Sequence, residues 1–88
     1  MNKDRRKAIA ALIEELEGLR DDIDSVVSRI DTLIDEEQEY YDNMPESFQT
    51  GDKGAAAEAA RDELQNAYDE LENFDFDSVI NYLNEAAA

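Results

Sequence analysis

The sequence predicts an all-α protein with a long helix, a shorter return helix and a short C-terminal helix, which together form a helical hairpin. Apolar residues keep helical spacing over most of the first half of the chain. The only proline and two of the three glycines fall in the short stretch 44–54. A second helical pattern, rich in alanine, follows that stretch. At 88 residues, the chain is expected to form one domain with a thin core.

The long helix is expected over about residues 3–43. With Ile9 as heptad position a, apolar residues fill positions a, d and e, a stripe wide enough for a helix in a bundle. Glu37 at a and Arg20 at e interrupt it. Asn2 is a suitable N-cap, and Pro45 ends the pattern. The series are Ile9, Leu16, Ile23 and Ile30 at a, Leu12, Leu19, Val26, Leu33 and Tyr40 at d, and Ile13, Val27, Ile34 and Tyr41 at e.

The rest of the chain supplies the return arm. A loop is expected over 44–52, with a helical turn after Pro45 as one possibility. The return helix is expected over about 53–73. A short helix over about 77–86 follows, and Asp75 or Asp77 is its candidate N-cap.

The short return arm also predicts a homodimer. The return helix has about half the length of the long helix. Even with the short C-terminal helix added, we expect part of the apolar stripe near the N-terminal half of the long helix, around Ile9 to Ile23, to stay uncovered and to need a partner. Two hairpins would then form a four-helix-type bundle. An antiparallel dimer would bring the basic start, Lys3–Lys7, toward the acidic face of the other chain. The predicted dimer interface is Ile9, Leu12, Leu16, Leu19 and Ile23.

Composition narrows the classes of partner. The chain has 24 acidic and 8 basic residues and a formal net charge of −16. Direct binding to nucleic acid is not expected, because phosphates require a positive surface, and anionic membranes repel the chain for the same reason. The sequence has no stretch long and apolar enough to cross a membrane and no signal-peptide pattern, which predicts a cytoplasmic protein.

Enzymatic chemistry is not expected. With no Cys and no His, zinc sites, thiol nucleophiles and imidazole bases are excluded. Carboxylate pairs are abundant, but acid–base catalysis needs a pocket that separates their pKa values, and a narrow bundle has little room for one. Glu37 is the best single candidate; it could instead pair with Tyr68 or Arg61 or reach solvent. We predict no catalytic residue, no metal site and no cofactor.

The acidic surface of the long helix is the strongest functional signal. Residues 14–42 contain twelve acidic and two basic residues, a net charge of −10. Such a rod can occupy the basic groove of a nucleic-acid-binding protein by charge complementarity. The plain alternative is a solvated face that keeps a bundle soluble. The predicted partner-binding acids are Glu14, Glu17, Asp21, Asp22, Asp24, Asp31, Asp35, Glu36 and Asp42.

The segment Asp35–Gln49, DEEQEYYDNMPESFQ, resembles a motif of short uncharacterised helical proteins of bacteriophages and prophages, EEQE-aromatic-DN(L/M)PES, which is followed there by a glycine-containing turn and an Ala/Glu-rich helix. The resemblance covers roughly residues 30–72. It implies an accessory protein that inhibits a nucleic-acid-handling host protein in the host cytoplasm, and it makes Glu37 part of a hairpin motif. Two alternatives stay open: an assembly protein whose apolar stripe is the functional interface, and a regulatory subunit of a larger complex.

Overall fold

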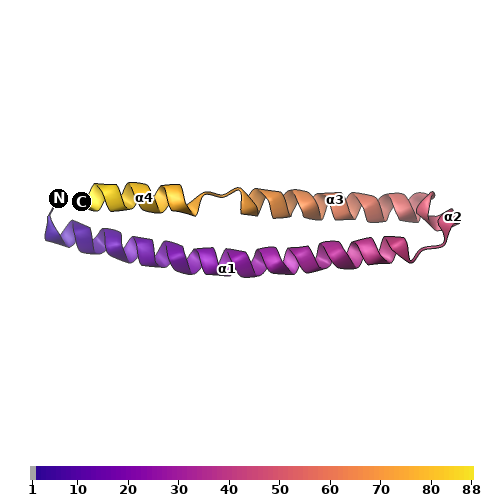
Figure 1. Ribbon diagram of the computed structural model, residues 1–88, viewed down its shortest axis with the longest axis horizontal. Helices are drawn as coiled ribbons and strands as arrows, with labels where there is room; N and C mark the ends of the chain where they lie inside the picture. The colour runs from indigo at the N-terminus through magenta and orange to yellow at the C-terminus, as the bar shows by residue number, and fades with distance from the viewer. Residues whose placement is uncertain (1) are drawn as a thin grey trace. The chain divides into compact units, whose positions relative to one another are not determined.

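The computed structural model describes residues 2–88, and this part of the chain is helical without a strand. Four helices follow one another (Figure 1): α1 at Lys3–Asp42, α2 at Glu46–Gln49, α3 at Asp52–Glu72 and α4 at Phe76–Ala87. The all-α prediction is therefore confirmed for these residues. The helical turn considered after Pro45 is α2. None of the described helices is long and apolar enough to cross a membrane.

Local signals in the sequence account for the ends of α1. The Asn2 side-chain oxygen accepts a hydrogen bond from the Arg5 backbone N–H at 2.8 Å, as expected of an N-cap. At the other end, Pro45 lies in extended backbone with φ −56° and ψ 147°. It has no N–H to continue a helix, and its ring disfavours helical backbone at Met44.

The described chain forms two compact units. Unit 1 contains α1 up to Ser25 and the segment Phe74–Ala88, so α4 lies antiparallel to the first part of α1 (Figure 1). Unit 2 is Val26–Asn73, a hairpin of the second part of α1, the short α2, and α3. In unit 1, α4 packs against the part of α1 that was expected to stay uncovered, so Ile9, Leu16 and Ile23 are half-buried, whereas Leu12 and Leu19 remain exposed.

The side chains of α1 that turn toward the return helices come from heptad positions a and e. Val27 is the only buried residue of α1. The other members are half-buried, and their spacing alternates between four and three residues, which keeps them on one side of a helix. We call this set the seam. Its members on α1 are Ile9, Ile13, Leu16, Arg20, Ile23, Val27, Ile30, Ile34, Glu37 and Tyr41.

The buried residues of the return helices are small in α3 and aromatic in α4. In α3, Gly54 and Ala57 are buried, and in α4 Phe76 is buried. Small residues at the start of α3 allow helix axes to come close, whereas Phe76 fills a larger space in unit 1. Both return helices are therefore anchored near their N-terminal ends.

The apolar residues at heptad position d of α1 stay outside the seam. They are between 40% and 55% exposed, although the sequence places them in the same stripe. We call them the outer apolar row. It consists of Leu12, Leu19, Val26, Leu33 and Tyr40, each seven residues from the next.

Candidate interaction surfaces

One side of unit 2 carries two lines of carboxylates, one from each helix of the hairpin. On α1, the b and f positions of the heptad supply exposed acids, and α3 supplies a matching line. We call this surface the polar side. Its carboxylates are Asp31, Asp35 and Asp42 on α1 and Glu58, Asp62, Asp69 and Glu72 on α3.

Two tyrosines between these lines report how closely the carboxylates approach. The charge of Glu72, partial burial and the charge of Asp31 raise the pKa of Tyr68. Interaction with the Glu58 carboxylate and partial burial raise the pKa of Tyr41. Carboxylates of both helices therefore raise the pKa of each tyrosine: Glu58 and Asp42 act on Tyr41, and Glu72, Asp69 and Asp31 act on Tyr68.

Arg61 is the only base on the polar side. Its guanidinium donates to the Gln38 side-chain oxygen and forms an ion pair with Asp62 at 3.4 Å. Glu37 is half-buried next to this group, but Arg61 binds its neighbour Gln38 instead. Neither contact predicted for Glu37, with Arg61 or with Tyr68, occurs among residues 2–88.

In unit 1, Arg20 explains why a charged residue interrupts an apolar series. Its guanidinium pairs with Asp77 and lies over the Phe76 ring, 5.6 Å from the centroid. Such a contact is favourable because the ring face is negative. Arg20 thus fixes the register of the first turn of α4 against α1. A carboxylate in that turn also suits the positive end of the helix.

Asp75 is the N-cap of α4, and it is one of the two candidates that the sequence offered. Its carboxylate accepts from the Ser78 backbone N–H at 3.0 Å and from the Ser78 hydroxyl at 2.7 Å. These bonds stabilise the charged form, so they hold the pKa of Asp75 below its usual value. The cap therefore favours the folded state above the ordinary Asp range and is lost as pH falls through the lowered value.

The Ser78 amide should report this pH dependence. In a two-dimensional NMR titration, its chemical shift should stay constant until the pH is below the ordinary Asp pKa of about 4, and then change as the cap is protonated. Asp75→Asn is the matched control, because it keeps an acceptor oxygen and does not titrate; its Ser78 shift should show no such step. A wild-type step at or above the ordinary value would contradict the lowered pKa.

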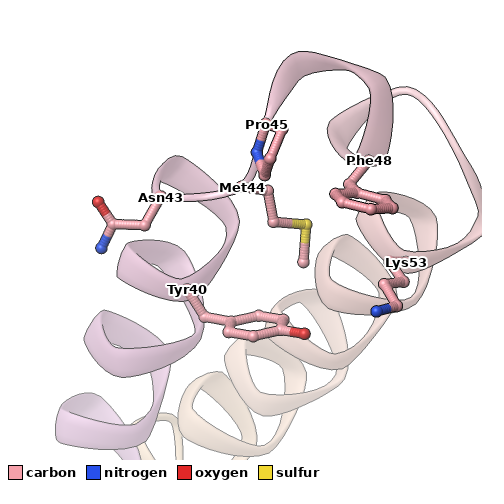
Figure 2. A pocket seen from close by; sticks show the side chains of 6 residues that line it. All are labelled: Tyr40, Asn43, Met44, Pro45, Phe48 and Lys53. Atoms are coloured by element: carbon pink, nitrogen blue, oxygen red, sulfur yellow. The ribbon is translucent and has the colours of Figure 1, made fainter.

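The opposite side of unit 2 carries exposed apolar residues. The outer apolar row supplies Leu33 and Tyr40, and Phe48 of α2 is exposed beside them. An open pocket of about 350 Å³ lies at the closed end of the hairpin (Figure 2). The Lys53 ammonium lies 5.1 Å from the centroid of the Phe48 ring. The pocket is lined by Tyr40, Asn43, Met44, Pro45, Phe48 and Lys53.

Unit 1 also has exposed apolar residues away from its ion pair. Leu12 and Leu19 belong to the outer apolar row, and Val79 and Tyr82 of α4 are exposed. Val79 lies two residues after Asp77, a rotation of about 200° around a helix. Since Asp77 turns to Arg20, Val79 lies on the flank of α4 opposite that pair.

The predicted partner-binding acids are all exposed, but they do not share one side. The b and f positions form a zigzag stripe on α1, whereas Asp22 and Glu36, at position g, border the outer apolar row. The stripe contains Glu14, Glu17, Asp21, Asp24, Asp31, Asp35 and Asp42. The predicted partner-binding acids therefore lie on two surfaces of α1: the stripe of b and f positions and the edge of the outer apolar row.

The predicted dimer interface is divided in the same way. Ile9, Leu16 and Ile23 are half-buried in the seam of their own chain, whereas Leu12 and Leu19 are exposed. The sequence interpretation did not single out the pocket, although most of its lining comes from the 35–49 motif. The resemblance of residues 35–49 to a phage motif was the sequence feature that could have pointed to this pocket.

No metal-binding group of three or more acidic side chains is present among residues 2–88. Comparison with known proteins finds no family model, no curated protein and no solved structure that matches the chain.

Proposed function

We propose that this protein is a non-enzymatic binding protein whose acidic polar side holds and inhibits a basic, nucleic-acid-handling protein. The observation that carries the proposal is the pair of carboxylate lines on one side of unit 2, with Tyr68 between Asp31 and Glu72. The resemblance of residues 35–49 to short phage proteins supports an accessory role against a host protein in the host cytoplasm.

The spacing of the carboxylates supports a mimic of nucleic-acid charge. Acids three or four residues apart in the α1 stripe are about 5 Å apart along the helix axis, and each strand of a duplex carries one phosphate per about 3.4 Å. The stripe is thus less densely charged than a duplex strand, but it has the same sign and a similar linear arrangement. A protein with a basic groove would be attracted to the stripe, and its rate of association would fall strongly as salt is added.

Charge reversal on the polar side should abolish the interaction. We expect Asp31→Lys, Asp62→Lys and Asp69→Lys together to reduce capture of nucleic-acid-binding proteins from a bacterial lysate at least tenfold. Captured proteins should be released by excess duplex DNA and by about 1 M salt, which shortens the Debye length to about 3 Å. The measurement is quantitative mass spectrometry of the captured fraction.

The matched control is Glu39→Lys, Glu63→Lys and Glu70→Lys, which makes the same change in net charge away from the polar side. This variant should keep most of the capture. Equal losses in both variants, or capture that persists at high salt, would contradict recognition by the polar side.

A second candidate function is assembly through the outer apolar row, with the charge serving only solubility. The exposure of Leu19 and Leu33 favours it. Leu19→Asp with Leu33→Asp should then abolish activity in the cell while the charge reversal has no effect. These two positions are better suited to the test than Leu16 and Ile23, which lie in the seam and whose loss would unfold the chain itself.

A further inference from the structure

We infer that the outer apolar row is the interface with a second copy of this chain, in which the two α1 helices pack antiparallel with Val26 at the two-fold axis. This goes beyond recognition of a basic partner and does not depend on it, because the row lies away from the polar side. A row of large apolar side chains that are 40–55% exposed along one helix is the kind of surface that a partner covers.

The row is symmetric about Val26. Leu19 and Leu33 each lie seven residues from it, and Leu12 and Tyr40 each lie fourteen residues from it. In an antiparallel pair centred there, Leu19 meets the partner's Leu33 and Leu12 meets the partner's Tyr40. A two-fold interface is self-complementary by construction, so every such contact occurs twice.

One pair of charges beside the row fits a second copy in this register. Asp22 and Arg29 both occupy position g, at the edge of the row. Antiparallel packing places Asp22 opposite the partner's Arg29, and symmetry repeats the pair. Arg29 is exposed and makes no ion pair among residues 2–88. Glu15 falls opposite the partner's Glu36, and salt screens this repulsion to the same extent as the attraction between Asp22 and the partner's Arg29, because all four side chains are exposed.

The ends of α1 distinguish the two possible orientations. Arg5 extends the row by one heptad, and it belongs to a first turn with Lys3, Arg6 and Lys7. Parallel packing would place two such basic turns side by side. Antiparallel packing places each of them near the last turns of the partner's α1, which carry Glu39 and Asp42. Charge complementarity therefore selects the antiparallel dimer.

Single cysteines test the orientation directly, because the chain contains none of its own. A disulfide needs Cα atoms within about 7 Å, which an antiparallel dimer provides for two copies of the same residue only at its two-fold axis. On mild oxidation, we expect Val26→Cys to form a covalent dimer and Leu12→Cys, far from the axis, to stay unlinked. An equal mixture of Leu12→Cys and Tyr40→Cys chains should link to each other. Ser28→Cys, on the outer side of α1, is the negative control.

Leu12→Cys linking to itself as efficiently as Val26→Cys would indicate a parallel dimer and overturn the inference. A wild-type chain that sediments as a monomer, with no linkage at position 26, would overturn it as well. Failure of polar-side capture in a chain that still dimerises would contradict only the proposed function, so the two failures are distinguishable.

A charge swap tests the same register without touching the apolar row. Asp22→Arg and Arg29→Asp should each raise the dimer dissociation constant about tenfold in sedimentation at low salt, because each places like charges together. The double variant restores both pairs, so its dissociation constant should return to within about threefold of the wild-type value. A double variant as weak as the single ones would rule out the pairing of residue 22 with the partner's residue 29.

Discussion

Replacement of Phe76 by alanine should release α4 from α1. Phe76 is 8% exposed and is the only buried residue of α4. Its ring meets Phe74 edge-on at a centroid distance of 4.6 Å and lies under the Arg20 guanidinium. Truncation of a buried phenylalanine costs about 3–5 kcal/mol in folding free energy, which is comparable to the total stability of a small domain.

Hydrogen exchange measured by mass spectrometry should separate the effect on the two units. Amides of α4 should lose protection in Phe76→Ala, whereas amides of α3 around Ala57 should change much less, because they belong to unit 2. Phe74→Ala is the matched control: Phe74 is 56% exposed, so its loss removes little beyond the ring contact, worth about 0.5–1.5 kcal/mol. Equal deprotection by the two variants would show that Phe76 is not the anchor.

A single methyl group at Gly54 should disrupt the hairpin of unit 2. A Cβ atom there would lie 1.9 Å from the Gln49 backbone oxygen and 2.7 Å from the Gln49 Cα. Backbone atoms cannot rotate away, so α2 and the first turn of α3 would have to separate. We expect a loss near or above the upper end of the about 1–3 kcal/mol typical of overpacking, seen as a lower midpoint in chemical denaturation.

The same substitution at Gly18 provides the control. Gly18 lies inside α1, and a Cβ atom there would meet nothing within 4 Å. Alanine loses less backbone entropy on folding than glycine, so Gly18→Ala should stabilise the chain by about 0.5–1 kcal/mol. Opposite signs from one chemical change would establish that close approach, and not helix propensity, decides the outcome at Gly54. A stabilising effect at both positions would contradict the packing of α2 on α3.

The elements of this protein could be predicted from its sequence because their signals are local. Helical periodicity, the Asn2 cap, the Asp75 cap and the break at Pro45 each depend on residues within a turn of one another. The acidic character of the surface also follows from composition alone. Such features need no knowledge of what packs against what.

Which apolar row faces inward was decided only by tertiary structure. Positions a, d and e of α1 are mostly apolar, and d and e lie on opposite flanks of a. The pattern is therefore compatible with either d or e facing the return helices together with a. The choice depends on distant partners: Arg20 at e meets Asp77, 57 residues later, and Tyr41 at e approaches Glu58. The same partners divide the acidic residues between two sides and leave row d exposed.

The sequence by itself therefore determined the three longer helices, the Asn2 cap and the sign of the surface charge, and it narrowed the α4 cap to Asp75 or Asp77. Tertiary structure decided that α4 covers the start of α1, that Ile9, Leu16 and Ile23 lie in the seam, and that Leu12 and Leu19 remain outside it. The physical reason is that a heptad pattern fixes angles around one helix axis. Only contacts between helices fix the rotation of that axis toward its neighbours.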